Sequence, residues 1–414
     1  MFATDSDESP LADDFERIGV PCETGGHTLS RFIDADEIVV SPGVPPRVPP
    51  LAEAASRGVP IVSELELASR YLKGDIVAIT GSNGKTTTTT LLGDMLVTRD
   101  RPVQVGGNIG TPVSDLVEGS TDETINVLEV SSFQLEGVVD FKPHVGVLLN
   151  VTPDHLDRYD GFEAYRLAKF KLFQNQNTSD FAVLNRDDPQ SFPVPVPIEA
   201  AALLFSQHRS LDTGACLVGD DLFVHGRRLM SVCDVPLRGN HNVDNVLAAA
   251  LVADTFAITL EQTASTIRNF HAVEHRLETV ATIDGVEFVN DSKATNVDSA
   301  VKAFESFEDN VIAIVGGKDK GSSYEPLIEA MQSRVKHVLL IGASAGKLES
   351  AIAGRVPTSR TGSLAQAVDQ SIGMGEPGDI VLLSPACASY DMFENFEARG
   401  RAFKKAVLSH VEVR

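Results

Sequence analysis

The sequence predicts an α/β protein of three domains built on parallel sheets, and three observations support this prediction. The chain has 414 residues, and at about 150 residues per domain such a length corresponds to roughly two to four domains. Short β-branched apolar runs alternate with helical stretches, which is typical of parallel strands covered by helices on both faces. The composition, 43% hydrophobic and 22% charged, is that of a globular protein and excludes extensive disorder, collagen and coiled coil.

Nine apolar runs have the length and composition of strands, and several end directly in glycine or in polar turn residues. In open parallel sheets, ligands bind at the carboxyl ends of the strands. Residues that carry chemistry are therefore expected just after these runs. The predicted strands are 37–40, 75–79, 125–130, 145–149, 181–184, 286–289, 311–315, 338–341 and 379–383.

Shifts in composition along the chain predict the domain boundaries. A proline-rich turn at 41–50 is followed by a strong strand that restarts the chain near residue 76. The pattern becomes β-like and irregular at 186–236, and a polar, histidine-rich link at 269–278 precedes a fresh set of α/β units. The predicted domains are an N-terminal domain at 1–71, a central domain at 72–272 and a C-terminal domain at 273–414.

Charge and cysteine content restrict the class of protein. The chain has 35 Lys and Arg against 58 Asp and Glu, a net charge of −23, which argues against general binding to nucleic acid or to an anionic membrane. The four cysteines lie far apart without a CxxC pair, which argues against a disulfide framework and a zinc site. The acidic N-terminus lacks the apolar segment of a signal peptide, and no apolar run approaches the ~20 residues that span a bilayer. A cytoplasmic protein is expected.

The strongest local signal is TGSNGKTTTTT, where a buried strand runs into a glycine-containing turn and a threonine-rich helix start. Glycines let backbone N–H groups point at phosphate oxygens, and the helix N-terminus and a lysine add positive charge. The turn is a shorter variant of the common phosphate loop, with two residues between its glycines instead of four. We therefore expect a site for nucleotide phosphates and Mg²⁺ at Gly81, Ser82, Asn83, Gly84, Lys85, Thr86 and Thr87.

Glu129 and His155 follow two further strands and are candidate metal ligands. Glu129 ends the strand at 125–130, where a lone carboxylate is costly unless it is paired or binds a metal. In a phosphate-loop enzyme this is the place of an acidic Mg²⁺ partner. His155 comes just after the strand at 145–149. The alternatives are a surface glutamate at a strand end and a structural histidine.

The helix predicted at 162–173 carries a lysine on its apolar side. Lys169 lies on an apolar stripe at helical spacing, whereas Lys171 lies about 200° further round at 3.6 residues per turn. A buried, neutral lysine amine can add CO₂ to become a carbamate. The alternative, favoured by the pattern alone, is a lysine that snorkels to solvent. The stripe consists of Phe162, Tyr165, Leu172 and Phe173.

Further signals lie in the second half of the chain. Asn242 and Asn245 lie one helical turn apart and can present their amides to one ligand. Three strand ends of the last domain carry polar groups: Asp291 and Lys293 after the first, two lysines within 314–321 after the second, and a Ser-Pro turn after the third. Lysine, serine and aspartate side chains that meet at the strand ends suggest an anionic ligand. Taken singly, each of these side chains also fits an ordinary loop with no ligand.

A series of motifs runs through nearly the whole chain: TGSNGKTT, GGNIG, LEVSSFQL, NVTPDHLDR, the Lys169 helix, GNHNVDN, EHR, NDSKATN, GGKDKG and SPACASYDMFENFEARG. Together they resemble the Mur ligase family of cell-wall synthesis, and the last motif is similar to that of members that add D-glutamate. The resemblance implies that ATP phosphorylates the alanyl carboxylate of UDP-N-acetylmuramoyl-L-alanine and that the D-glutamate amine then displaces phosphate. It also implies a truncated Rossmann-like N-terminal domain, a central phosphate-loop ATPase-like domain and a Rossmann-like C-terminal domain, in a monomer.

The resemblance assigns roles to residues at matching positions. Lys85 and Thr86 would hold the ATP phosphates and one Mg²⁺, with Glu129 as a further ligand of that ion. His155 and Lys169, the lysine as a carbamate formed with CO₂, would hold a second Mg²⁺. The nucleotide would also contact Asn242, Asn245, Arg276, Asp291 and Lys293. The muramoyl substrate would contact Asn108, and D-glutamate would be framed by Thr295, Lys320, Ser389 and Phe396.

The beginning of the chain departs from the family pattern. Family members open with a strand and a glycine-rich loop that hold the uridine diphosphate, whereas this chain starts at what resembles the end of the second strand. Asp5 and Ser6 match the acidic turn of that pocket, and Ser41 matches its other side. We expect either a start codon placed too late or weak binding of the nucleotide sugar, with the ATP and D-glutamate sites unaffected.

Three other functions compete with this one. A folate polyglutamate ligase would need pterin-site features that the sequence lacks, and the SPACAS block argues against it. A phosphate-loop ATPase that acts as a switch or motor is disfavoured because the last domain carries its own loops rich in lysine and serine. A non-catalytic remnant is motivated only by the missing N-terminal unit.

Overall fold

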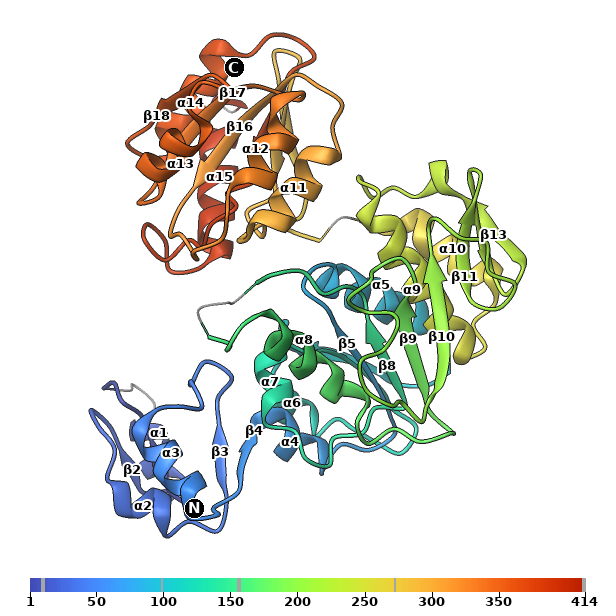
Figure 1. The fold of residues 1–414 in the computed structure, drawn as a ribbon, viewed down its shortest axis with the longest axis vertical. Coiled ribbons are helices and arrows are strands. Elements are labelled where there is room, and N and C mark those ends of the chain that lie inside the picture. The colour runs from blue at the N-terminus through green and yellow to red at the C-terminus, as the bar shows by residue number, and fades with distance from the viewer. Residues whose placement is uncertain (9–11, 98–99, 155–157, 272, 412–414) are drawn as a thin grey trace.

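The fold consists of three α/β domains that follow one another along the chain (Figure 1). Each domain contains parallel strands, so the predicted fold class is confirmed. The domain boundaries at 71/72 and 272/273 stay predictions. The computed structural model describes residues 1–8, 12–97, 100–154, 158–271 and 273–411.

The N-terminal domain holds two short pairs of strands. Its elements are β1 (Ala3–Thr4), α1 (Ala12–Arg17), β2 (Cys22–Glu23), α2 (Leu29–Ile33), β3 (Ile38–Val40), α3 (Pro49–Ser56) and β4 (Ile61–Ser63). β1 pairs with β2 and β3 pairs with β4, both in parallel, and the two pairs form separate sheets in the described part of the chain. Phe32, Leu51 and Ala54 form a small core.

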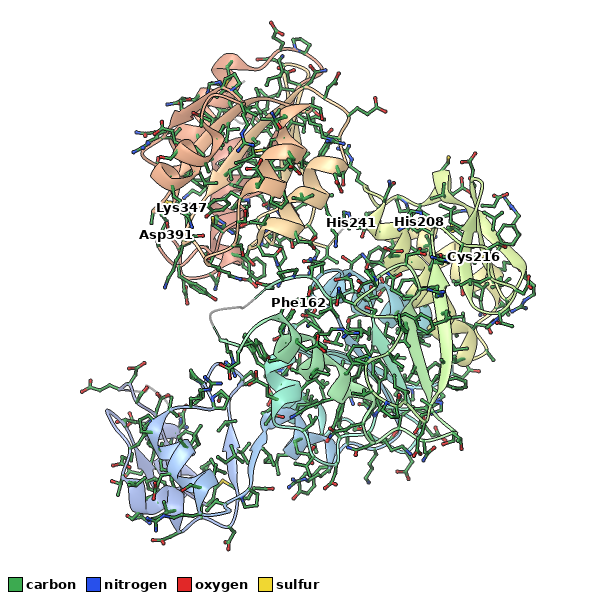
Figure 2. All side chains as sticks on the ribbon, viewed as in Figure 1. Phe162, His208, Cys216, His241, Lys347 and Asp391 are labelled. Atoms are coloured by element: carbon green, nitrogen blue, oxygen red, sulfur yellow. The ribbon has the colours of Figure 1, made fainter. Side chains whose placement is uncertain are left out.

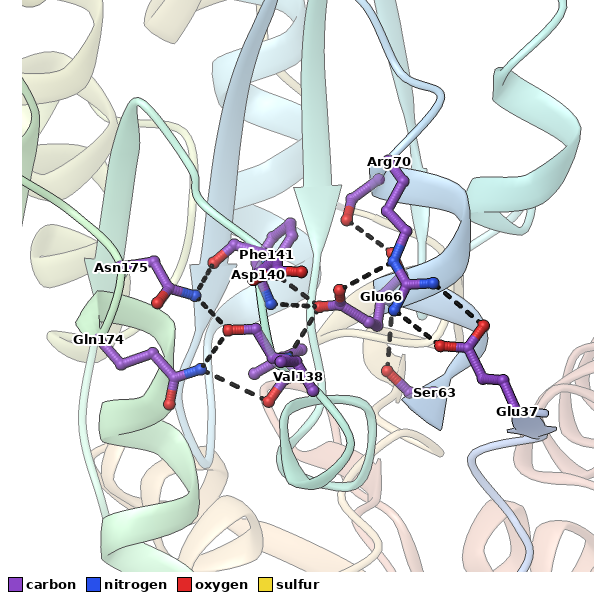
Figure 3. Close-up of polar contacts among 11 residues, drawn as sticks. Glu37, Ser63, Glu66, Arg70, Val138, Asp140, Phe141, Gln174 and Asn175 are labelled. Carbon is purple, nitrogen blue, oxygen red and sulfur yellow. Dashed lines mark hydrogen bonds and ion pairs between the residues drawn. The ribbon is translucent and has the colours of Figure 1, made fainter. Parts of the chain in front are cut away.

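α4 (Glu64–Ser69) joins the N-terminal domain to the central one through a buried carboxylate (Figure 3). The Glu66 side chain is fully buried, and its Oε2 accepts hydrogen bonds of 2.9–3.1 Å from the backbone N–H groups of residues 139–141. Arg70 donates to Glu66 Oε1 (3.2 Å) and, through both terminal nitrogens, to the carboxylate of Glu37 (3.0 and 2.9 Å). Because Glu37 lies just before β3, this chain of contacts links the two domains.

The central domain is built on a nine-stranded mixed sheet. Its strands are β5 (Asp75–Thr80), β6 (Val103–Gly107), β7 (Ile125–Glu129), β8 (Val145–Leu148), β9 (Phe181–Asn185), β10 (Ala201–Ser206), β11 (Ala215–Val218), β12 (Asp221–Val224) and β13 (Arg227–Ser231). The order across the sheet is β13-β12-β11-β10-β9-β8-β5-β7-β6. The strands from β6 to β11 in this order run parallel, and β12 and β13 add an antiparallel edge.

Helices cover both faces of this sheet, as continuously apolar strands require. They are α5 (Lys85–Leu96), α6 (Val113–Leu116), α7 (Ser132–Glu136), α8 (Phe162–Phe170), α9 (His241–Thr255) and α10 (Leu260–Asn269), with a 3₁₀ turn at Lys171–Phe173. Side chains alternate along a strand, so Val77 and Ile79 pack with α5, α9 and α10, whereas Ala78 packs with α4, α6, α7 and α8 on the other face.

The C-terminal domain has a six-stranded sheet in the order β14-β15-β19-β16-β17-β18, with β14 as an antiparallel edge. The strands are β14 (Glu278–Ile283), β15 (Val286–Asn290), β16 (Val311–Gly316), β17 (Val335–Ile341), β18 (Thr358–Arg360) and β19 (Ile380–Leu383). The helices are α11 (Val297–Glu305), α12 (Glu325–Gln332), α13 (Ala345–Ile352), α14 (Leu364–Met374) and α15 (Phe396–Val411). α11, α12 and α13 cover one face, and α14 and α15 cover the other.

All the predicted strands are present within a few residues of the expected bounds. The strands that were not predicted individually are short or only partly buried, such as β1, β4 and the β10–β13 edge, where the apolar signal is weak. In the described part of the chain, every helix is too short or too polar to cross a bilayer.

Candidate active site

The glycine loop, which we define as residues 81–84, connects the carboxyl end of β5 to the N-terminus of α5. Gly84 has a φ of 86°, and a Cβ on it would lie 2.2 Å from Asn245 Oδ1. Only glycine combines this left-handed conformation with so close a contact. Asn150 holds the loop from the side: its Oδ1 accepts from the N–H of Asn83 (2.9 Å) and its Nδ2 donates to Asn83 O (3.1 Å). In the described structure no side chain caps α5, so its first N–H groups can bind an anion.

Two lysines converge on one carbonyl oxygen of this loop. Lys85 Nζ and Lys169 Nζ each donate to Gly81 O at 2.9 Å. Burial lowers the pKa of Lys85 against the attraction of Glu129. Burial, together with repulsion from Lys85, brings the pKa of Lys169 well below its usual value. Because two ammonium charges on one acceptor repel each other, the geometry favours a neutral amine at Lys169.

Lys169 lies on the inner side of α8, as the apolar stripe predicts. Its side chain is 1% exposed, and its Nζ lies 4.6 Å from the centre of the Tyr165 ring. The alternative of a snorkelling lysine is therefore wrong. The Tyr165 hydroxyl shares a hydrogen bond with Ser82 Oγ (2.9 Å), which ties α8 to the glycine loop. Lys171 is only half-buried and donates to a backbone carbonyl of α7.

Glu129, at the end of β7, lies in the middle of a buried polar cluster. Its Oε2 accepts from Thr86 Oγ1 (2.6 Å), and its Oε1 accepts from Asn108 Nδ2 (2.9 Å). Burial by itself would raise the pKa of Glu129, but two nearby lysines and these hydrogen bonds lower it. The alternative of a surface glutamate is wrong, because the residue is 1% exposed. His155, the other candidate ligand, lies outside the described residues.

The C-terminal domain adds basic and acidic groups to this cluster. Arg276, in the link before β14, donates from Nη2 to Thr86 Oγ1 (2.8 Å). Asp291 and Lys293 follow β15. Burial raises the pKa of Asp291 to about 7, although Ser384 donates to its carboxylate (3.0 Å). Burial, with repulsion from Arg276, lowers the pKa of Lys293 to about 8. The structure thus brings these predicted nucleotide ligands together with the α5 N-terminus.

Arg276, Asp291 and Lys293 line a cleft between the central and C-terminal domains with a volume of about 50 Å³. Asn242 and Asn245 line it from α9, and Asn245 Nδ2 donates to Asn242 Oδ1 (2.9 Å). His241 begins α9 on the side facing the C-terminal domain (Figure 2), and burial lowers its pKa to about 4. Ligand pockets typically have about 300 Å³ or more. A neighbouring pocket of about 290 Å³ shares Asn83, Gly84, His241 and Asn245 with this cleft.

The residues predicted to frame D-glutamate are only partly brought together. Phe396 lies at the start of α15, and the Nζ of Lys293 is 3.9 Å from the centre of its ring. Lys320 instead reaches a carboxylate of the central domain, at 3.5 Å. Ser389 lies beyond the carboxyl end of β19 and Thr295 beyond that of β15. All four follow the carboxyl ends of parallel strands, as expected for this type of sheet, but they are not among the residues that line the cleft described above.

The N-terminal candidates lie apart from this cluster. Asp5 and Ser6 follow β1 and Ser41 follows β3, and all three are exposed. Among the described residues, no hydrogen bond or ion pair joins them to the glycine loop. The loop next to Ser41 does contact the central domain, since two of its carbonyl oxygens accept from Arg158 (3.1 and 3.3 Å).

Three charged residues that bridge domains are absent from the predicted set. Arg158 contacts the N-terminal domain, Asp154 accepts from Asn296 Nδ2 (2.9 Å) and pairs with Lys320, and Asp298 contacts the glycine loop. Their motifs, PDHLDR and NDSKATNVD, are visible in the sequence. Their partners are distant in sequence, however, so spacing along the chain gives no sign of the contacts.

Three family models match the chain. They are the Mur ligase MurD-like N-terminal domain at residues 2–63, the Mur ligase middle domain at 79–253 and the Mur ligase glutamate ligase domain at 275–387. A relative from Solibacter usitatus is 47% identical over 390 residues, which cover 94% of this chain and 88% of the relative. One from Acidobacterium capsulatum is 47% identical over 398 residues, covering 95% and 86%. Both are named UDP-N-acetylmuramoylalanine–D-glutamate ligase.

Solved structures share the fold. A pseudomurein peptide ligase type C from Methanothermus fervidus has a TM-score of 0.66 at 17% identity, covering 99% of this chain and 94% of that one. A MurF ligase from Thermotoga maritima in complex with ADP has a TM-score of 0.64 at 19% identity, covering 92% and 97%. The three models and the close relatives lead to one conclusion: the chain belongs to the Mur ligase family, alongside the relatives named UDP-N-acetylmuramoylalanine–D-glutamate ligase.

Proposed function

We propose that this chain is an ATP-dependent ligase that joins D-glutamate to UDP-N-acetylmuramoyl-L-alanine in the synthesis of peptidoglycan precursors. The observation that carries the proposal is the contact of Arg276, from the C-terminal domain, with Thr86 at the N-terminus of α5 (2.8 Å). A cation brought by one domain to the phosphate-binding end of another can stabilise the charge of a phosphoryl group in transfer. The choice of substrates rests on the relatives, whose name specifies both.

The reaction would proceed in two displacements. An oxygen of the alanyl carboxylate attacks the γ-phosphorus of ATP and ADP leaves. The D-glutamate amine then attacks the carbonyl carbon of the acyl phosphate, loses a proton, and phosphate leaves. In this chain Lys85, Arg276 and Lys293 would neutralise the oxygens on which charge accumulates, and the glycine loop would hold the phosphates by its N–H groups. Asn242, Asn245 and Asp291 would hold the rest of the nucleotide.

The buried carboxylate and hydroxyl beside the glycine loop fit a magnesium ion. Thr86 Oγ1 and Glu129 Oε2 are 2.6 Å apart, and hydroxyl and carboxylate oxygens next to a phosphate loop are typical Mg²⁺ ligands. Asn108 would orient the Glu129 carboxylate by its hydrogen bond of 2.9 Å and lie beside the muramoyl substrate. When bound, Mg²⁺ supplies positive charge to the phosphoryl oxygens.

Lys169 would serve as a carbamate and, with His155, hold a second Mg²⁺. Its buried amine has a pKa held well below the usual value by burial and by Lys85, and a neutral amine is the form that adds CO₂ with loss of a proton. The product would carry a negative charge, which attracts the neighbouring Lys85 ammonium and would give the metal an oxygen ligand.

The remaining substrate contacts follow the same reasoning. D-glutamate would lie among Thr295, Lys320, Ser389 and Phe396, where the Lys320 ammonium can pair with a carboxylate. Asp5, Ser6 and Ser41 would lie beside the uridine diphosphate. The enzyme would act in the cytoplasm as a monomer.

An assay of phosphate release tests the proposal. The purified chain is incubated with UDP-N-acetylmuramoyl-L-alanine, ATP and Mg²⁺, and with D-glutamate, L-glutamate or no amino acid. We expect phosphate and a UDP-linked dipeptide product only with D-glutamate. Phosphate release that needs neither the nucleotide sugar nor an amino acid would instead support a switch or motor ATPase. Release with a folate substrate in place of the nucleotide sugar would support the folate ligase.

A further inference from the structure

The first residues of α11, in the C-terminal domain, form hydrogen bonds with the glycine loop of the central domain. Asn83, inside the loop, donates from Nδ2 to Asp298 Oδ2 and accepts at Oδ1 from Ser299 Oγ. Thr152, after β8, donates from Oγ1 to the same Asp298 oxygen (3.0 Å). One carboxylate oxygen of the C-terminal domain thus binds two separate segments of the central domain.

The carboxylate is held in place from its own helix. Lys302 Nζ, one turn further along α11, lies 3.0 Å from Asp298 Oδ2. Both side chains are about a quarter exposed, so the ion pair by itself contributes little to stability. Its effect is to restrict the Asp298 side chain to the orientation in which it reaches the glycine loop. Hydrogen bonds to a charged oxygen are stronger than neutral ones, and two of them here cross the domain boundary.

The position of Asp298 connects the two halves of the candidate site. α11 begins directly after the segment that carries Lys293 and Thr295, so the helix and that segment move together. On the central side, the backbone of Asn83 is fixed by Asn150. A contact between the side chains of Asn83 and Asp298 therefore fixes the distance between the phosphate-binding loop and the groups of the C-terminal domain.

We propose that Asp298 is a positioning residue that couples closure of the C-terminal domain to the geometry of the glycine loop. It touches no reacting atom. It holds the basic groups of the C-terminal domain against the loop once a nucleotide is in the cleft. The inference uses the proposed ligase reaction as one of its readouts, and it adds a role for a residue that the reaction chemistry does not require.

The test is a double-mutant cycle on the pair Asp298 and Thr152, with Glu305→Gln as the matched control. Glu305 is an exposed acid on the same helix, and its variant should stay within about twofold of the parent, as surface substitutions usually do. Asp298→Ala should lower kcat by about fivefold or more, the usual range of coupling between sites, with a smaller loss for Thr152→Val. The kcat of the double variant should be no lower than that of Asp298→Ala, because both substitutions remove the same contact. Asp298→Asn, which keeps one acceptor oxygen, should recover part of the activity.

Two measurements make the outcome decisive. An Asp298→Ala enzyme with an unchanged melting temperature shows that the loss is not unfolding. Its radius of gyration by small-angle scattering, with ADP and Mg²⁺, should exceed that of the parent chain. Activity of Asp298→Ala within about twofold of the parent, or losses for the two single variants that multiply in the double variant, overturns the proposal. If the parent chain lacks ligase activity, the proposed function fails. In that case the role of Asp298 is tested by the same double-mutant cycle, measured as changes in ADP affinity, together with the radius of gyration from scattering.

Discussion

At the scale of single residues, the most informative feature is the shared acceptor of two lysines. Gly81 O receives both Lys85 Nζ and Lys169 Nζ at 2.9 Å. A nucleotide requires the first of these as a cation. The second is buried beside Tyr165, and burial together with repulsion from Lys85 brings its pKa well below the usual value, against the attraction of Asp154 and Glu129. The proposed carbamate therefore makes the protonation state of Lys169 the first property of the site to test.

If Lys169 is the proposed carbamate ligand, Lys169→Ala is expected to lower kcat by about 100-fold, because the metal site loses one ligand. A short carboxylate such as acetate should restore part of the activity, since it can enter the space of the missing carbamate. Lys171→Ala, on the outer side of the same segment, is the control and should remain within about threefold of the parent. The carbamate assignment fails if Lys169→Ala keeps full activity, or if added CO₂ leaves the mass of Lys169 in the native protein unchanged.

The pH dependence of kcat/KM for ATP should be bell-shaped and narrow. The pKa of Asp291 is raised to about 7 by burial and that of Lys293 is lowered to about 8. Asp291 becomes ionised as the pH rises through the first value, and Lys293 loses its charge as it rises through the second. If both charged forms are needed, activity falls on either side of this window. Lys293→Arg keeps a cation at high pH, so its alkaline limb should move upward; an unmoved limb assigns the titration to another group.

At the scale of elements, α4 shows how a short helix can join two domains. Burial alone would raise the pKa of Glu66, but the backbone N–H groups of residues 139–141 and the Arg70 guanidinium outweigh it and lower the pKa. A carboxylate with a lowered folded pKa stabilises the fold above its unfolded value, which is about 4.3. This contribution is lost as the pH falls through the folded pKa.

Glu66→Gln should destabilise the protein by about 2–3 kcal/mol at neutral pH, because three N–H groups lose a charged acceptor. Chemical denaturation at a series of pH values measures this difference. The difference in unfolding free energy should have its full value above pH ~5 and should decrease in acid, because the parent Glu66 side chain is then protonated. Glu37→Gln removes only the partly exposed partner of Arg70 and should cost less than about 1 kcal/mol. A Glu66→Gln difference that does not change with pH would show that the carboxylate charge plays no part.

At the scale of the whole molecule, polar contacts connect three domains that have separate cores. The loop of residues 41–44 meets the central domain through Arg158, whose guanidinium also lies 4.0 Å above the Phe133 ring and pairs with Glu136 at 2.9 Å. On the other side, Asp154 of the central domain contacts the C-terminal domain, and Asp298 and Arg276 of the C-terminal domain contact the central domain. These interdomain contacts lie beside the predicted substrate sites, so the orientation of the domains also determines the shape of those sites.

Arg158→Ala should raise the KM for UDP-N-acetylmuramoyl-L-alanine by about tenfold while changing that for ATP by less than threefold, since one hydrogen-bonded anchor contributes about 1–1.5 kcal/mol. Steady-state kinetics with each substrate varied in turn measure the split. Arg47→Ala is the control, because Arg47 forms an exposed ion pair with Asp160 that should contribute little. An equal rise in both KM values would mean that Arg158 supports the central domain as a whole.

The sequence by itself determined the α/β class, the predicted strands and the local chemistry of the glycine loop. Each of these depends on residues close together in the chain: an apolar run, a pair of glycines, a lysine on an apolar stripe. The tertiary structure alone decided that Lys85 and Lys169 share Gly81 O, that Arg276 reaches Thr86, and that Asp298 and Asp154 join the domains. These contacts link residues up to 215 positions apart. Their energy depends on burial and on how domains pack, which periodicity along the chain does not encode.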